Sequence, residues 1–442
     1  MKRKGINANI KVAKFGGTSL ADANQIKKVL AIIQADSELQ YIVVSAPGKR
    51  HSKDKKITSL LEKWHQLHKN GHSYARVQKI VSNRFSKIVQ ELGIKLDIHA
   101  EMVEIAHWIN SGATLDYAIS RGEYLMGKII AIALEYDFVD PATCINFNRQ
   151  GQHIEDYKQI GKILKGKKAV IPGFYGASQD GFIKTFSRGG SDITGAIIAC
   201  AVRAAVYENW TDVSGFLMAD PRVVERPMKI ESMTHREQRE LSYMGAGVFH
   251  EEAMFPLRNT GTAINIRNTN DPSNSGTLIV ADGGQGRKPW VITGVAGRKN
   301  FTSIRVEKAI MNRQVGFARK ILTILEKNDI SFEHIPGGID TLSIIINDKQ
   351  LYGKKQKVVR EIRKICSPDL IKITSGMAMI AIVGQAMVHR PGIAAIVFTA
   401  LANEKINVKM INQGSSEISI IIGVKNDDYE NAVRAIYEGF VG

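Results

Sequence analysis

Cysteine is rare in this chain. The 442 residues include only Cys144, Cys200 and Cys366, an odd number at wide spacings. This pattern excludes a disulfide framework and a cysteine-rich metal knuckle. Long apolar runs are also missing, because no stretch approaches the roughly 20 residues that a membrane-spanning helix needs. The basic start at residues 1–5 is not followed by the apolar stretch of a secretory signal. We therefore expect a cytoplasmic protein with reduced thiols and no membrane partner.

Acidic residues are outnumbered by basic ones. The chain has 60 Lys and Arg against 43 Asp and Glu, which gives a formal net charge of +17. Such an excess can indicate a nucleic-acid partner. Here the basic residues are dispersed and form no stripe interleaved with aromatic residues, so we expect no nucleic acid to bind. The positive field instead suits small anionic substrates. With 44% hydrophobic residues, the chain is long enough for two or three domains.

Short apolar runs alternate with helical patterns in the first part of the chain. Lys11–Phe15, Tyr41–Ser45 and Ala169–Tyr175 are typical of β-strands closed by glycine or proline. The region Leu60–His107 is predicted to be largely helical, and a strong helical pattern follows Gly190. This alternation predicts a largely parallel sheet that is covered by helices on both faces.

The last third of the chain contains an internal repeat. The Gly-rich polar stretch Ala281–Pro289 is the best candidate for a domain boundary. After it, residues 315–346 and 390–422 share one pattern, which is a glycine, an amphipathic helix, a turn and a hairpin-like pair of strands. The spacing of about 75 residues is that of a repeated structural unit.

The run Lys14–Ser19 (KFGGTS) has the features of a phosphate-binding loop. It follows a predicted strand and precedes a predicted helix. Glycines let the backbone approach a phosphate closely, and a helix N-terminus offers free N–H groups and a partial positive charge. The spacing of a P-loop is absent. An ordinary tight turn is the alternative for this run when it is considered alone.

Two later runs place polar residues at the ends of other predicted strands. In Ser187–Asp192 (SRGGSD), Arg188 can grip a carboxylate with two parallel hydrogen bonds. Asp192 either caps the following helix, together with Ser191, or binds a substrate ammonium. The third run is Trp210–Gly215, followed by Asp220–Arg222, where ligands of α/β sheets commonly bind. The alternative for Asp220–Arg222 is a solvated turn.

Taken together, the motifs resemble those of a known family. In order they are KFGGTS, VSAP at 44–47, SRGEYL at 120–125, SRGGSD, WTDV at 210–213, DPRV at 220–223 and SYMGAGVFH at 242–250. The chain resembles a monofunctional aspartokinase of the amino-acid kinase superfamily, and the C-terminal repeat resembles the tandem ACT domains of that family.

The resemblance implies a fold of class α/β with two parts. The first is an amino-acid kinase fold with a largely parallel central sheet between helical layers, and two ferredoxin-like (βαββαβ) ACT units follow it. Residues 1–280 are expected to form the catalytic domain. Residues 281–300 would hold the linker and the first strand of a nested second ACT unit, 301–373 the first ACT unit and 374–442 the rest of the second.

The resemblance also implies an activity. The chain would transfer the γ-phosphoryl group of ATP, with Mg²⁺, to the side-chain carboxylate of L-aspartate, the first step toward lysine, threonine and methionine. Inhibition by lysine, alone or with threonine, and a homodimer or tetramer formed through the ACT units are expected. Two alternatives stay open, namely a kinase of another small carboxylate or nucleotide and a degenerate kinase that acts as an amino-acid sensor.

The family roles carry over to individual residues of this chain. The catalytic residues are expected to be Lys14, Arg188 and Asp192. The aspartate site is expected to comprise Ser45, Thr58, Glu123, Arg188 and Ser191. The nucleotide is expected to contact Lys14, Gly16, Gly17, Thr18, Ser19, Thr211, Asp212 and Arg222. No residue is assigned to hold the metal.

Three positions depart from the family pattern. Leu217 stands where many members have a tyrosine, and Gly247 where many have a lysine near the ATP phosphates. The effector is expected to contact the loop before the first ACT helix and the strand after that helix, where Glu333 replaces the aspartate of lysine-binding relatives. These residues are Met311, Gln314, Val315, Gly316, Phe317, Ala318, Ser331, Phe332 and Glu333. The alternative for Glu333 is a solvated charge.

Overall fold

The computed structural model describes residues 7–187, 189–247, 249, 251–258, 260–281 and 291–442. Its contacts divide the chain into two compact units. The first unit comprises Met1–Phe216, Glu231–His235 and Val248–Arg287, and the second comprises Leu217–Ile230, Arg236–Gly247 and Lys288–Gly442. Each unit has its own sheet and its own hydrophobic core. The predicted boundary at 281–289 lies outside the described residues except for its first residue, so the predicted domain limits stay predictions.

The first unit is built on an eight-stranded sheet in the order β11-β13-β12-β8-β1-β2-β5-β3. Among the strand pairs that the structure describes in this sheet, only β12–β13 is antiparallel, which confirms the predicted, largely parallel sheet. The strands are β1 (Asn7–Phe15), β2 (Leu39–Val44), β3 (Asp137–Phe138), β5 (Ala169–Pro172), β8 (Ala204–Thr211), β11 (Ser232–Thr234), β12 (Ala263–Asn268) and β13 (Thr277–Val280). The first unit also has a separate three-stranded sheet in the order β4-β6-β7. Its strands are β4 (Asn146–Phe147), β6 (Tyr175–Ser178) and β7 (Ile183–Thr185).

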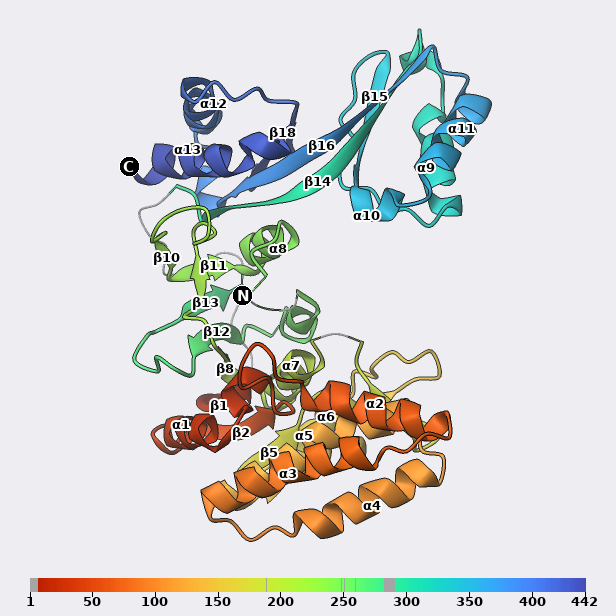
Figure 1. Ribbon diagram of the computed structural model, residues 1–442. Coiled ribbons are helices and arrows are strands. Elements are labelled where there is room, and N and C mark those ends of the chain that lie inside the picture. The colour runs from red at the N-terminus through yellow and green to blue at the C-terminus, as the bar shows by residue number, and fades with distance from the viewer. Residues whose placement is uncertain (1–6, 188, 248, 250, 259, 282–290) are drawn as a thin grey trace. The chain divides into compact units, whose positions relative to one another are not determined.

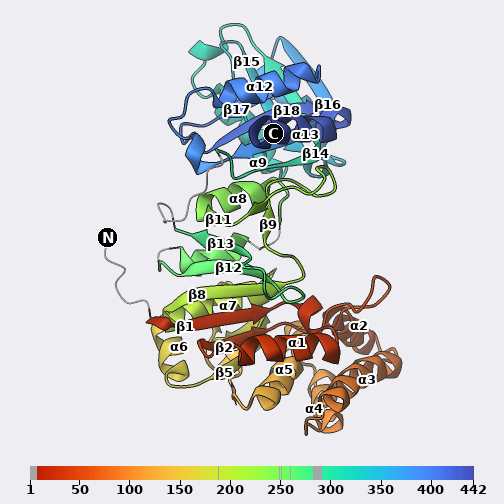
Figure 2. The ribbon, with the colours of Figure 1, turned by 90° about the vertical axis from the view of Figure 1, so that its left-hand side faces the viewer.

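Helices cover both faces of this sheet. Figure 2 shows α1 in front of β1 and β2, with α7 behind them. Helical segments of the first unit are η1 (Gly17–Leu20), α1 (Ala23–Gln34), α2 (Ile57–Lys69), α3 (Ala75–Leu92), α4 (Ile98–Asn110), α5 (Leu115–Leu134), η2 (Pro141–Thr143), α6 (Tyr157–Leu164), α7 (Gly190–Val202) and η3 (Glu251–Leu257). The predicted helical region Leu60–His107 is confirmed by α2, α3 and α4.

The alternation of β1 decides which helices each of its side chains meets. Ala13 and Phe15 belong to the core that α1 to α5 share with the sheet. Successive side chains of a strand point to opposite faces. Lys14 therefore points to the other face, where α7 lies against β1.

The predicted strand Ala169–Tyr175 is in fact two strands. β5 ends at Pro172 and β6 begins at Tyr175. Phe174 has a left-handed φ of 80°, and a Cβ on Gly173 would lie 2.6 Å from the Cβ of Ser191. The chain turns at this pair because only glycine lets it pass so close to α7.

The second unit contains a five-stranded antiparallel sheet in the order β15-β14-β16-β18-β17. Figure 1 shows α9 beside α11 and α12 beside α13 next to this sheet. Its strands are β14 (Gly294–Glu307), β15 (Thr341–Asn347), β16 (Leu370–Val383), β17 (Met410–Gln413) and β18 (Ser419–Lys425). Its helical segments are η4 (Met311–Arg313), α9 (Phe317–Lys327), α10 (Asp348–Leu351), α11 (Lys355–Cys366), η5 (Gln385–Met387), α12 (Ile393–Asn403), η6 (Asn426–Asp428) and α13 (Tyr429–Val441).

Three further elements lie where the chain leaves the first unit: β9 (Phe216–Leu217), β10 (Lys229–Ile230) and α8 (His235–Tyr243). Most of their residues belong to the second unit. Among the helices of the described chain, none combines the length and the apolar character that crossing a membrane requires.

The internal repeat is visible in the backbone of the second unit. Gly316 and Gly392, 76 positions apart, precede helices of 11 residues each and have φ values of 81° and 88°. The two long strands join the repeats, because β14 pairs with β15 of the first and β16 pairs with β18 of the second. Gly294–Gly297 of β14 pair with Ile380–Val383 of β16, whereas the end of β14 pairs with the beginning of β16.

Candidate functional site

The carboxyl ends of three parallel strands meet at one edge of the large sheet. The amide of Ser45, after β2, donates to the carbonyl of Phe15 at the end of β1 (3.2 Å), and the amide of Gly16 donates to the carbonyl of Trp210 in β8 (3.0 Å). These backbone bonds hold the glycine loop, the loop after β2 and the end of β8 together. The structure thus brings Lys14, Ser45 and Thr211 to the same edge.

The glycine loop packs backbone against backbone. A Cβ on Gly17 would lie 2.8 Å from the carbonyl oxygen of Ala46, and the amide of Gly48 donates to the carbonyl of Gly17 at 2.7 Å. No larger side chain fits at Gly17 without displacing the loop after β2. The loop then forms the 3-10 turn η1, and α1 begins only at Ala23, capped by Asp22.

The two hydroxyls of this loop differ in their surroundings. Ser19 is buried, and its hydroxyl shares a hydrogen bond of 2.8 Å with that of Thr269. Thr18 is exposed. Ser19 therefore supports the turn, while Thr18 is free to contact a ligand.

Lys14 places a positive charge at this edge of the sheet. Its Nζ lies 2.6 Å from Oδ1 of Asp192, and the two side chains are 10% and 17% exposed. The same Nζ lies 3.6 Å from the position of a Cβ on Gly16. The ammonium is therefore held over the glycine loop in a position where an anion can reach it.

The prediction that Ser191 and Asp192 cap α7 is wrong. The N-cap is Gly189, with a left-handed φ of 59° and no side-chain cap, and both residues lie in the first turn. Ser191 is 9% exposed and packs on Gly173. Because the helix begins two residues earlier than predicted, Asp192 is turned toward β1 and β8 and pairs with Lys14.

Two residues of β8 that the sequence reasoning missed fix Asp192. Nδ2 of Asn209 donates to Oδ1 of Asp192 at 2.7 Å, and the hydroxyl of Tyr207 donates to the backbone carbonyl of Asp192 at 3.1 Å. Both side chains are buried, and burial raises the pKa of Tyr207 well above its usual range. The sequence feature that could have indicated these two residues is the polar Asn209, two positions after Tyr207 in a mostly buried strand.

Glu123 is a buried carboxyl group. It lies in α5, is only 5% exposed, and its Oε2 has no hydrogen-bond partner among the described residues. A Cβ on its neighbour Gly122 would lie 2.8 Å from the Cβ of Ala46, so this turn of α5 touches the loop after β2. Burial raises the pKa of Glu123 to about 8, although the Ala46 amide and Arg121 act in the opposite direction. Glu123 is therefore not a surface carboxylate.

An arginine that the sequence reasoning also missed braces the loop after β2. The guanidinium of Arg84, in α3, donates to the carbonyls of Ala21 and Gly48 and to Oδ2 of Asp54, each at 2.8 Å. The hydrogen bond from Arg50, together with that from Arg84, holds the pKa of the Asp54 carboxyl well below its usual range. The loop between β2 and α2 is thereby tied to the glycine loop.

The remaining predicted site residues are placed as follows. Thr58 is the second residue of α2 and is half-buried. The hydroxyl of Thr211 donates to Asp212 at 3.2 Å. Arg222 belongs to the second unit, where its exposed side chain is bound to Asp220 at 2.6 Å, as in the alternative of a solvated turn. Arg188 lies outside the described residues.

In the second unit the predicted effector residues form two segments. Gly316 is the left-handed N-cap of α9, Val315 before it is fully exposed, and Phe317 is buried. Met311 and Gln314 flank η4, and Ala318 is exposed in the first turn of α9.

The segment after α9 is not a strand, although its backbone is attached to β15. Ser331 and Phe332 are exposed, and the Glu333 amide donates to the carbonyl of Ile345. The Glu333 side chain is 12% exposed, accepts from the hydroxyl of Tyr243 at 2.5 Å and lies 3.4 Å from Arg298. The alternative of a solvated charge is therefore wrong.

Comparisons with known proteins agree with this architecture. The sequence profile of the amino acid kinase family matches residues 9–268, and that of an ACT domain matches residues 380–440. Aspartokinase 3 of Bacillus subtilis is 36% identical over 449 residues, which cover 98% of each chain. Lysine-sensitive aspartokinase 3 of Escherichia coli is 25% identical over 97% of this chain and 99% of its own. The crystal structure of Clostridium acetobutylicum aspartate kinase matches with a TM-score of 0.92 and 51% identity, covering 98% of this chain and 99% of that one.

The buried carboxyl of Glu123 gives a prediction about stability. Its pKa in the folded chain is about 8 against 4.5 for the ordinary group, so the folded state binds the extra proton between these values and stability falls as the pH rises through them. Glu123→Gln removes this ionisation. We expect the variant to be more stable by roughly 3 kcal/mol at pH 7 and nearly equal at pH 4.5.

Urea unfolding of the first unit between pH 4.5 and 8.5 measures this difference. Glu104→Gln, an exposed carboxylate of α4, is the matched control and should show no such pH dependence. A Glu123→Gln variant less stable than the parent at pH 8 would contradict the assignment of an uncompensated buried carboxylate.

Proposed function

Since this chain belongs to the aspartokinases of the amino acid kinase family and is an aspartate kinase, we propose that it transfers the γ-phosphoryl group of MgATP to the side-chain carboxylate of L-aspartate and forms 4-phospho-L-aspartate. The observation that carries the proposal is the Lys14 ammonium, held over the glycine loop by Asp192. The family membership rests on the amino acid kinase match over residues 9–268 and on the Bacillus subtilis relative.

The proposed reaction does not depend on a general base. The side-chain carboxylate of aspartate has an ordinary pKa of about 3.9, so it is already ionised at neutral pH and needs no proton acceptor. The difficulty is to bring two anions together and to stabilise charge on the moving phosphoryl group. Lys14 and the amides of the glycine loop supply positive charge and hydrogen-bond donors at the end of β1.

Asp192 pairs with Lys14 and orients its side chain before substrate binds. At 2.6 Å the carboxylate neutralises the ammonium and fixes its direction. A phosphate group has more negative charge than one carboxylate, so it can share the ammonium that Asp192 holds in place. In this proposal Lys14 contacts the phosphoryl group throughout the transfer, and Asp192 keeps it from turning away.

Glu123 is the proposed counter-charge for the substrate ammonium. Its Oε2 is buried without a partner beside the loop that carries Ser45. A buried carboxyl that lacks a partner is neutral or costly, and an ammonium placed against it favours the ionised form. We propose that the ammonium of aspartate fills this role, with Ser45, Thr58 and Ser191 as nearby hydroxyls and Arg188 on a substrate carboxylate.

Mg²⁺ is proposed to enter with ATP. Among the described residues no group of three His, Cys, Asp or Glu is placed to hold a metal ion. The donors at this edge are the Lys14 ammonium and backbone amides, which suit phosphate oxygens. The Thr18 hydroxyl and the Asp192 carboxylate are the oxygen donors offered to the ion. When bound, Mg²⁺ neutralises charge on the transferring group.

Substrate choice is tested by a panel assay. ADP release should be measured with aspartate, glutamate, N-acetylglutamate and carbamate, each with MgATP. We expect turnover with aspartate to exceed the others by far, because Glu123 and Arg188 match an amino acid with a free ammonium. A chain that binds amino acids but releases no ADP with any acceptor would be the degenerate sensor instead.

Regulation is proposed to act through the second unit. The Escherichia coli relative is named for its sensitivity to lysine, and we propose that lysine binds between the segments 311–318 and 331–333, with its ammonium at Glu333. An effector that binds away from Lys14 inhibits only if it binds two global states with different affinity. We also propose that the chain forms a homodimer or tetramer through the second unit.

The first prediction of this function concerns Lys14. Lys14→Ala removes the cation nearest the glycine loop, and we expect kcat to fall roughly 100-fold or more. Steady-state kinetics with aspartate and ATP measures the loss. Lys11→Ala is the matched control, because Lys11 lies in the same strand and is also ion-paired, with Asp36 and Glu38. A folded Lys14→Ala enzyme with near-normal kcat would refute the role.

The second prediction concerns Asn209, which positions Asp192 without reaching the substrates. Asn209→Leu removes the 2.7 Å hydrogen bond to the carboxylate that holds Lys14. We expect kcat to fall roughly 10- to 100-fold, because the lost bond is to a charged group. Both KM values should stay within about twofold. Unchanged kcat, or a loss confined to the KM of aspartate, would show that Asn209 has another role.

The third prediction concerns Glu333. Without its carboxylate the proposed lysine site loses the partner of the effector ammonium, so Glu333→Ala should raise the lysine concentration needed for half-inhibition by roughly tenfold or more. The readout is the ratio of activities with and without millimolar lysine. Glu326→Ala, an exposed carboxylate of α9, is the control. If the parent enzyme ignores lysine and threonine, alone or together, the proposed regulation is wrong and the kinase assignment is unaffected.

A further inference from the structure

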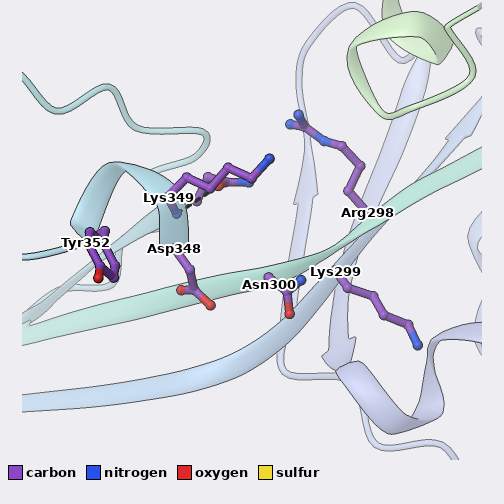
Figure 3. A pocket seen from close by; sticks show the side chains of 7 residues that line it. Arg298, Lys299, Asn300, Asp348, Lys349 and Tyr352 are labelled. Carbon is purple, nitrogen blue, oxygen red and sulfur yellow. Dashed lines mark hydrogen bonds between the residues drawn. The ribbon is translucent and has the colours of Figure 1, made fainter.

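A cavity of about 640 Å³ lies in the second unit between β14 and α10. Figure 3 shows the side chains that line it. They are Arg298, Lys299, Asn300, Asn347, Asp348, Lys349 and Tyr352. This cavity is separate from the segments that we propose for lysine, and the functions discussed so far do not use it.

The cavity exists because the pairing of β14 is interrupted there. The register of β14 against β16 shifts between Arg298 and Phe301, and Asn300 has a left-handed φ of 72°. Such an irregularity turns side chains away from the regular ladder. On the opposite wall, α10 follows directly after β15 and carries Asp348 and Lys349.

Two cations point into the same space, as Figure 3 shows for Arg298 and Lys349. Within the part of the chain that the structure describes, the Lys349 ammonium has no hydrogen-bond or ion-pair partner. The described hydrogen bonds of Arg298 both go to Glu333 and are long, at 3.4 Å, and its buried Nε has no acceptor among the described residues. Charge-assisted hydrogen bonds are usually about 2.7–2.9 Å. Both cations therefore retain capacity for an anion.

The other lining groups limit what kind of anion fits. The Lys299 ammonium is bound to Glu430 at 2.6 Å and is not available. Asp348 accepts from the hydroxyl of Thr302 at 2.6 Å through Oδ1, which leaves Oδ2 for another donor. Asn300 accepts from Asn426 and keeps its own amide hydrogens. Two cations, one carboxylate oxygen and an amide donor suit a small organic acid better than a highly charged phosphate.

We propose that this cavity binds a small carboxylate-bearing ligand, with its carboxylate between Arg298 and Lys349. A planar guanidinium and an ammonium on opposite walls can take the two oxygens of one carboxylate. If the ligand is an amino acid, Oδ2 of Asp348 receives its ammonium. The proposal concerns binding alone and does not depend on the kinase reaction.

The geometry couples this cavity to Glu333. Arg298 contacts both the cavity and the Glu333 carboxylate, which in turn accepts the hydroxyl of Tyr243. A ligand carboxylate therefore competes with Glu333 for the same guanidinium. It follows that neutralising Glu333 should tighten binding, whereas removing Lys349 should weaken it. A general loss of structure cannot produce these opposite effects.

The test is isothermal titration of the full chain with glutarate, L-glutamate and inorganic phosphate. L-Aspartate is left out, because it is itself a small carboxylate-bearing ligand and would compete for the cavity. We expect millimolar or tighter binding of at least one carboxylate. Lys349→Ala should weaken it five- to tenfold, and Glu333→Gln should tighten it at least twofold. Lys327→Ala, which removes an exposed lysine of α9 outside the cavity, is the control and should leave the affinity unchanged. Because Arg298 packs on Tyr243 and Phe301, its own substitution could unfold the unit and is not used.

Each outcome decides the proposal. Binding of L-glutamate alone supports it and assigns the ammonium to Asp348, while binding of both carboxylates supports it for carboxylic acids in general. The proposal is overturned if neither carboxylate binds, if phosphate binds as tightly as they do, or if Lys349→Ala and Lys327→Ala have equal effects. Failure of the kinase assay would leave these binding results intact.

Discussion

The site of the first unit depends on one close contact between backbones. Gly17 and Gly48 approach so closely that neither tolerates a Cβ, and the Gly48 amide donates to the Gly17 carbonyl at 2.7 Å. This contact joins the loop after β1 to the loop after β2, and Arg84 fastens the second loop by its bond to the Gly48 carbonyl. Because the first loop follows the strand of Lys14 directly and the second touches the helix of Glu123, the same contact helps to set the distance between the proposed phosphoryl and ammonium subsites.

The electrostatics of the two subsites differ. The cation Lys14 is paired in advance with Asp192, which has a neutral support in Asn209. Oε2 of Glu123 has no partner among the described residues, and burial raises the pKa of this carboxyl group to about 8. A paired cation is oriented at little cost to stability, whereas an unpaired buried acid destabilises the ionised fold. The chain thus keeps an unfavourable group where a substrate ammonium can compensate it, which is the usual relation between stability and function at binding sites.

Sequence reasoning found the local parts of this arrangement and missed the long-range ones. The glycine loop, Lys14 and Glu123 lie in short motifs whose chemistry is visible without a structure, and the parallel sheet follows from the alternation of strands and helices. The cap prediction for Asp192 was wrong because Gly189, with a left-handed φ, is the N-cap and α7 begins earlier than predicted. The sequence alone does not show which residue adopts that φ angle. Arg84 lies in a polar helix and reads as a surface residue, since its partners are 30 and more positions away.

In the second unit, too, sequence reasoning missed long-range contacts, and the arrangement of the strands explains why. β14 pairs with β15 of the first repeat and β16 with β18 of the second, and the two long strands also pair with each other, so the sheet has no break at which one repeat ends. The pairing shifts register between Arg298 and Phe301 and again between Phe301 and Ser303, in the middle of β14. A side chain at this junction contacts groups that local pattern cannot connect, such as Glu333 of one repeat and Tyr243 of α8. Because close-packed interiors transmit strain, and β14 and β16 pair with the strands of the two repeats, a change at the slip in β14 is expected to reach both repeats.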